Sequence, residues 1–156
     1  EALKLLRRGV IDYYASTREY VHSAVQSWCA QTLVFLLRTE LETAWQIWAL
    51  AHRQIQGTSV PTWNAYVWLV GAMLAARSDD SEFSKEGALQ RCEQALEQIV
   101  PGLRYLHLSF SARYWYKLGD TDQAGAIWTE AQTIFAEDPE ALAMVRDAAE
   151  NAGVVE

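Results

Sequence analysis

The sequence predicts an all-α protein built from consecutive helical hairpins. Apolar residues recur at helical spacing along the whole chain, and no segment shows the sustained alternation of apolar and polar residues that is typical of a strand. Residues that start and stop helices recur at short intervals. With 156 residues, of which 51% are hydrophobic, the chain has the size and composition of one folded domain, and we expect a single domain over 1–156.

The start and stop signals divide the chain into eight expected helices. They lie near residues 1–14, 17–38, 40–56, 61–77, 84–100, 102–118, 121–136 and 139–152. The connections between them are short, apart from a polar segment at 78–83. Because short connections keep consecutive helices adjacent, these helices are expected to pack antiparallel, as hairpins.

Two kinds of signal mark the helix starts. Segments 16–19 and 39–42 have the Ser/Thr-x-x-Glu pattern of a capping box, in which the hydroxyl and the carboxylate satisfy two backbone N–H groups. Pro61, Pro101 and Pro139 each fall at the beginning of an apolar periodic segment, where the fixed φ of proline suits the first turn of a helix. Five helix starts are therefore predicted at these points.

Single residues mark further helix ends. Gly57 and Gly119 fall where helices should stop, and each is expected in the left-handed conformation that glycine adopts cheaply. Asp138, immediately before Pro139, is the expected N-cap of the last helix.

A row of small, large and small residues, spaced by four and then three positions, occurs three times. The rows are Ala44, Trp48 and Ala51, then Ala88, Cys92 and Ala95, then Ala124, Trp128 and Ala131. Small Ala side chains let the two helices of a hairpin approach closely, while the large residue fills the groove against the next hairpin. The rows therefore predict a stack of hairpins in which each buries its apolar face on its neighbour.

The third row resembles the tetratricopeptide repeat. Segment 116–124, followed by Trp128 and Ala131, is similar to the Gly-Asp-x-x-x-Ala-x-x-x-aromatic-x-x-Ala core of that family, and Trp28 and Trp68 are similar to the aromatic residue of its first helix. The resemblance implies a right-handed superhelix, a TPR-like solenoid of about three divergent helix-turn-helix units with flanking helices. The parts are an N-terminal helix (1–16), three units (17–57, 58–100 and 101–137) and an acidic C-terminal capping helix (138–156).

The resemblance also implies a concave groove, lined by the first helix of each unit, that binds a partner protein or peptide. The matching positions are Gln26, Cys29 and Leu33 in the first unit, Tyr66, Leu69, Met73, Ala76 and Arg77 in the second, and Leu106, Ser109, Arg113, Tyr116 and Lys117 in the third. Three of these residues, Arg77, Arg113 and Lys117, would then converge on a carboxylate-bearing segment, because guanidinium groups bind carboxylates bidentately. The alternative is that the three cations pair with the chain's own acidic C-terminal helix.

The helices near 61–77 and 102–118 carry apolar residues on more than one face. Such a helix is either covered by neighbouring helices on both sides or exposes one side to a ligand. The sequence leaves both arrangements open.

Residues that would carry catalysis are sparse. His22, His52 and His107 occur singly, without a partner at metal-ligand spacing, and no phosphate loop, nucleophile elbow or dinucleotide fingerprint occurs. We expect no catalysis, no metal site and no cofactor. Cys29 and Cys92 have no Cys-x-x-Cys spacing and are expected to be buried free thiols.

The charge restricts the partners. Lys plus Arg number 13 and Asp plus Glu number 20, a net charge of −7, which disfavours nucleic acid as a partner. No apolar run approaches the roughly 20 residues needed to cross a bilayer, so we do not expect membrane insertion. We expect the protein to be cytoplasmic. The apolar and basic segment 1–14 is expected either to pack on the next helix or to mediate self-association.

We expect a non-enzymatic interaction module that acts as an adaptor, scaffold or chaperone-like protein. One alternative is a ligand-sensing or peptide-sensing domain of a larger signalling or transcription protein, which the start at Glu1 rather than Met slightly favours. Another is a homo-oligomeric assembly unit joined through its terminal helices. Trp45, which the repeated row does not include, is a candidate secondary contact.

Overall fold

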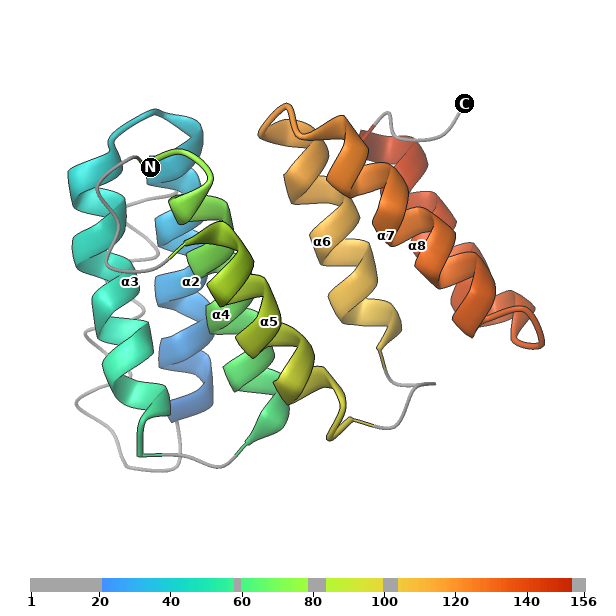
Figure 1. Cartoon of the computed structure of the whole chain (residues 1–156), viewed down its shortest axis with the longest axis horizontal. Helices are drawn as coiled ribbons and strands as arrows, with labels where there is room; N and C mark the ends of the chain where they lie inside the picture. The colour runs from blue at the N-terminus through green and yellow to red at the C-terminus, as the bar shows by residue number, and fades with distance from the viewer. Residues whose placement is uncertain (1–20, 58–59, 79–83, 100–103, 153–156) are drawn as a thin grey trace. The chain divides into compact units, whose positions relative to one another are not determined.

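The computed structural model describes residues 21–57, 60–78, 84–99 and 104–152 (Figure 1). Within these ranges all regular structure is helical and no strand occurs, so the predicted all-α class is confirmed. None of the helices in them is long and apolar enough to cross a membrane. The chain divides into two compact units, Glu1–Leu96 and Glu97–Glu156, and each is described by itself.

The first unit contains four described helices, coloured from blue to yellow-green in Figure 1. They are α2 (Val21–Leu37), α3 (Leu41–Ile55), α4 (Pro61–Ala75) and α5 (Lys85–Leu96). Helix α2 packs against α3 and α4, and α4 also packs against α3 and α5. Because α4 contacts three helices, every residue from Val67 to Leu74 is buried, which is the covered arrangement that its all-round apolar sequence allows.

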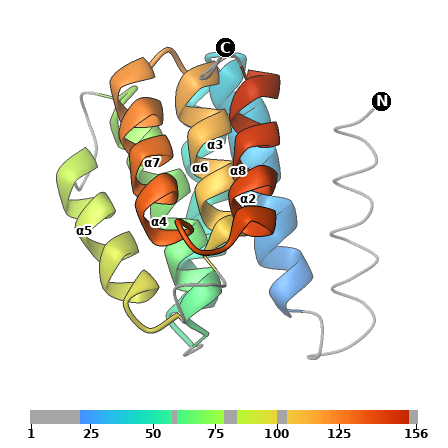
Figure 2. The same cartoon turned by 90° about the vertical axis from the view of Figure 1, so that its right-hand side faces the viewer.

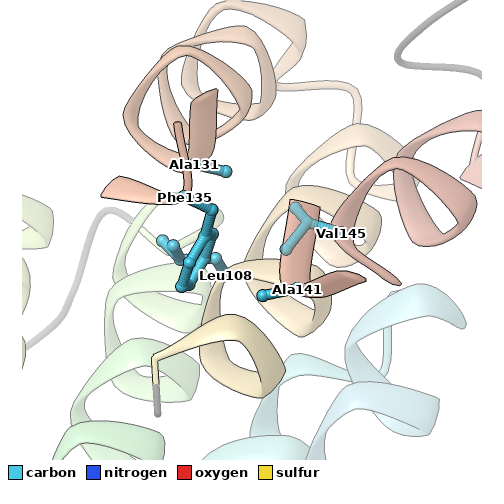
Figure 3. Packing of buried hydrophobic residues seen from close by; sticks show 5 residues of the cluster. All are labelled: Leu108, Ala131, Phe135, Ala141 and Val145. Carbon is cyan, nitrogen blue, oxygen red and sulfur yellow. The ribbon is translucent and has the colours of Figure 1, made fainter. Parts of the chain in front are cut away.

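The second unit contains α6 (Tyr105–Lys117), α7 (Thr121–Ile134) and α8 (Pro139–Ala152). Helix α6 packs against both α7 and α8, as Figure 2 shows. The three helices enclose a small apolar core (Figure 3), formed by Leu108, Ala131, Phe135, Ala141 and Val145. Leu108 and Phe135 are the two largest buried side chains of this core, at 1% exposure each.

Two of the five predicted helix starts, those at Pro61 and Pro139, are confirmed by the structure. Helix α4 begins at Pro61 and α8 at Pro139, and the Oδ1 atom of Asp138 accepts a hydrogen bond from the Ala141 N–H at 3.0 Å, as an N-cap does. The helix expected at 1–14, the capping box at 16–19 and Pro101 lie outside the described residues. The other seven helices are confirmed, with ends within a few residues of those expected wherever the structure describes them.

Two predicted helix signals are wrong. Helix α3 ends just before Gly57, as predicted, but the φ of Gly57 is not left-handed. Thr39 does not cap α3: the N-cap is Glu40, which makes no side-chain capping bond. Thr39 instead belongs to the end of α2, where it takes a left-handed φ of 61°.

The α2–α3 and α6–α7 connections have the same hydrogen-bond pattern. The N–H groups of Thr39 and Glu40 donate to the carbonyls of Leu36 and Phe35 at 3.1 and 2.9 Å. In the second unit, the N–H groups of Gly119 and Asp120 donate to Tyr116 and Trp115 at 2.9 Å each. Both are Schellman motifs, with Thr39 and Gly119 as the left-handed residues.

The three repeated rows lie on buried helix faces, as predicted. Their six alanines are all buried, and so are Trp48 and Cys92, whereas Trp128 is half-buried. The Trp48 indole contacts the backbone of α4, where its Nε1–H donates to the Val67 carbonyl at 2.8 Å. The small residue Gly71 makes this approach possible, because a Cβ there would lie 2.8 Å from Trp48 Cζ2. Superhelical handedness and the boundaries of the three units stay predictions.

Candidate binding surface

Helix α6 has a buried face and an exposed face. Leu108, Ala112 and Trp115 are buried, with exposures of 1%, 0% and 0%. At 100° per residue, Arg113 and Lys117 lie about 140° and 180° around the helix from Leu108. Both cations are exposed, so they lie on the side of α6 opposite to the core of the second unit.

Aromatic rings flank these two cations. The rings of Phe110 and Tyr114 are 4.5 Å apart and tilted by 41°. The Lys117 ammonium lies 5.9 Å from the centre of the Tyr114 ring, within the range of a cation–π contact. We call the surface formed by Phe110, Arg113, Tyr114 and Lys117 the α6 outer face.

The charge of this face comes from its arginine and lysine. His107 lies on the same helix, but burial, with a smaller contribution from the Arg104 guanidinium, lowers its pKa to about 4. The imidazole is therefore neutral near pH 7 and adds no positive charge to α6. Two exposed cations beside partly exposed rings suit a ligand that offers carboxylates next to apolar groups.

The second unit contains five of the predicted groove residues. Arg113 and Lys117 are exposed and share one face, while Tyr116 is half-buried and lies to one side of it. Leu106 and Ser109 belong to α6, but their side chains lie outside the described part of the structure.

The sequence prediction did not include Phe110 and Tyr114 in the site. The signal was their spacing, because each lies three residues before one of the two cations and therefore near it on the helix surface.

The first unit places its predicted groove residues differently. Tyr66 is half-buried and Arg77 is exposed just beyond the end of α4, but Leu69 and Met73 are in the core, with exposures of 1% and 0%. Their role as partner contacts stays a prediction that this burial does not favour. The convergence of Arg77 with the cations of α6 also stays a prediction, because these residues belong to different units.

The positions carried over to α2 are mostly buried. Gln26 is exposed, whereas Cys29 and Leu33 are in the core, at 0% and 1% exposure. Burial raises the pKa of the Cys29 thiol, so it stays protonated and unreactive. Cys29 and Cys92 are both buried free thiols, which confirms that prediction.

Trp45 is half-buried at the edge of an aromatic cluster in the first unit. Its ring lies edge-on to Trp48 at 5.4 Å. His52 stacks on the Trp48 ring at 4.7 Å and meets Trp68 edge-on at 4.8 Å. Arg91 of α5 lies 4.5 Å from the centre of the Trp68 ring. These contacts join α3, α4 and α5, so the cluster has a structural role whether or not Trp45 also contacts a partner.

Metal-binding side chains do not gather in the described part of the chain. Among those residues, no three His, Cys, Asp or Glu side chains are placed to hold a metal ion.

Comparison with known proteins gives no relative for this chain: no protein-family model, curated protein or solved structure matches it. The resemblance to the tetratricopeptide repeat therefore stays a prediction. The structure supports a coarser statement, that the described part of the chain is all-helical and that its neighbouring helices pack in pairs.

Proposed function

We propose that this protein is a non-enzymatic interaction module that binds an acidic segment of a partner protein on the α6 outer face. The observation that carries the proposal is the pair of exposed cations, Arg113 and Lys117, beside the Phe110 and Tyr114 rings. Arginine and lysine attract carboxylates, and the neighbouring rings supply apolar area that a bound segment removes from water. Adaptor, scaffold and chaperone-like roles all use a surface of this kind.

We further propose that the helices form a TPR-like stack of hairpins. Support comes from the two Schellman connections, in which Thr39 and Gly119 occupy equivalent places. It also comes from the buried small–large–small rows, which fall on the second helix of each expected hairpin. In such a stack the first helix of a hairpin is the one that presents a binding face, and α6 is the first helix of the third hairpin.

The test compares partner capture by the wild type and by Arg113→Ala plus Lys117→Ala. The matched control is Arg38→Ala plus Arg53→Ala, which removes two exposed cations from the first unit. We expect a specific protein, identified by mass spectrometry, to be retained from a native lysate by the wild type and the control but lost from the α6 variant. Retention should also fall as salt is raised, because salt screens exposed charges. Equal retention by all three proteins would show that the α6 outer face is not the binding site.

A further inference from the structure

The α6 outer face presents two neighbouring rows of side chains. Arg113 and Lys117, four residues apart, form a cationic row, and Phe110 and Tyr114, also four apart, form an aromatic row. Side chains four residues apart on a helix lie about 5–6 Å from each other, so each row spans one turn. The two rings are in contact within the aromatic row, at 4.5 Å, and the 5.9 Å contact from Lys117 to Tyr114 joins the two rows.

We propose that the partner segment is an amphipathic helix that carries two carboxylates four residues apart beside an apolar row, and that it lies along α6. This inference rests on the proposed function and specifies the conformation and residue pattern of the segment that binds. Two carboxylates on successive turns have the same spacing as Arg113 and Lys117, so each pairs with one cation. The apolar row of the segment then lies over Phe110 and Tyr114.

An extended segment fits this face less well. In a strand, successive side chains point to opposite sides, so carboxylates at alternate positions turn the residues between them away from the surface. Such a segment meets the cationic row but not the aromatic row beside it. A helix presents two adjacent rows on one side, and rows of four-residue spacing are those that interdigitate when helices pack.

The charge of the chain is consistent with a foreign partner helix rather than a second copy. The chain has a net charge of −7, so two copies repel each other at long range. A short acidic helix is attracted locally by Arg113 and Lys117. His107, on the same helix, is neutral near pH 7 and adds nothing to this attraction.

The experiment uses fluorescently labelled synthetic peptides and the full chain. Two peptides have the same composition of Glu, Leu and Ala. One places Glu four residues apart beside a Leu row with the same spacing, and the other places Glu and Leu at alternate positions. A third peptide has Lys in place of Glu in the first pattern. We expect the first peptide to bind about tenfold more tightly than the second, and to lose this advantage with Arg113→Ala plus Lys117→Ala.

Charge reversal gives an independent readout that does not depend on loss of binding. Arg113→Glu plus Lys117→Glu should bind the Lys peptide and reject the first Glu peptide, while its circular dichroism remains that of the wild type. Equal affinity for the two Glu patterns would overturn the helical mode and leave the proposed function standing. If neither Glu peptide binds the folded wild type, both proposals fail. A mass of two copies that falls to one in the Arg113→Ala plus Lys117→Ala variant would assign the face to a second copy of this chain instead.

Discussion

Thr39 has a backbone conformation that its side chain disfavours. Its φ of 61° lies in the left-handed region, where a β-branched residue is strained, and Gly119 has a φ of 84° at the equivalent place in the second unit. The residues that follow them, Glu40 and Asp120, also differ, because only Asp120 caps the next helix with its side chain. Asp120 caps α7 by accepting a hydrogen bond from the Gln123 N–H at 3.1 Å, whereas the Glu40 carboxylate pairs with Arg38 at 2.9 Å and leaves α3 uncapped. The first connection is therefore the less favourable version of the second.

We expect Thr39→Gly to stabilise the protein by about 0.5–1 kcal/mol, because relief of left-handed strain exceeds the extra flexibility of glycine in the unfolded chain. The matched control is Gly119→Thr, which should destabilise by about 1–2 kcal/mol. A Cβ at Gly119 meets no atom within 4 Å, so this loss reports conformation alone. Urea denaturation followed by circular dichroism measures both changes. An unchanged midpoint for Thr39→Gly would mean that Thr39 is not strained.

At the scale of helices, the contact between α3 and α4 depends on a missing side chain. Trp48 donates its indole N–H to the Val67 carbonyl, and its ring occupies the space where a residue other than glycine at position 71 would place a Cβ. The sequence shows Gly71 as a glycine inside a helix, which by itself is only a weak point of that helix. The close approach of an indole gives it a packing role.

Gly71→Ala tests this role. Alanine favours a helix over glycine by about 1 kcal/mol, but a Cβ at 2.8 Å from Trp48 forces the two helices apart, and we expect a net loss of about 1–2 kcal/mol. Gly125→Ala in α7 is the control, because a Cβ there meets no atom within 4 Å. It should stabilise by up to about 1 kcal/mol. Thermal or urea unfolding distinguishes the two signs, and stabilisation by both substitutions would refute the wedged position of Trp48.

At the scale of the whole molecule, stability depends on pH through His107. Its pKa is about 4 in the folded protein, against about 6.5 for an unperturbed histidine, so the fold favours the neutral ring. The stability that this preference contributes is fully present above about pH 6.5, declines as the pH falls, and is lost once the pH passes below about 4.

We expect the free energy of unfolding to fall by about 1–2 kcal/mol between pH 7 and pH 5 because of this group, since each pH unit below 6.5 costs about 1.4 kcal/mol and solvent reaches part of the half-buried ring. The variant His107→Gln cannot titrate and serves as the reference. Urea midpoints of both proteins at several pH values isolate the contribution of His107 from that of the carboxylates. If the two proteins lose stability in parallel, His107 is not the cause.

Local signals in the sequence predicted the positions of the described helices and the faces that carry the small–large–small rows. Pro61, Pro139, Asp138 and Gly119 act within one helix turn, so their effects can be recognised without knowledge of the fold. Thr39 was misassigned because the same four residues fit both the end of one helix and the start of the next. Backbone hydrogen bonds decide between these two possibilities, and the residue pattern does not show them.

The candidate site was predictable in part. The resemblance to the tetratricopeptide repeat indicated Arg113 and Lys117, and charged side chains stay in water unless they are paired. Leu69 and Met73 were predicted as groove residues in the same way as Arg113 and Lys117. Three helices pack against α4, however, and place both residues in the core.

By itself, therefore, the sequence determined the all-helical class, the helix positions and the buried rows, because helix formation depends on residues a few positions apart. The tertiary structure alone decided that Trp48 lies on Gly71 and that Leu69 and Met73 are in the core, whereas Leu108, Ala112 and Trp115 became the buried face of α6 because α7 and α8 pack against it. Burial and ring contacts depend on which neighbouring helices pack against a face, and that arrangement is set by contacts between residues distant in the chain.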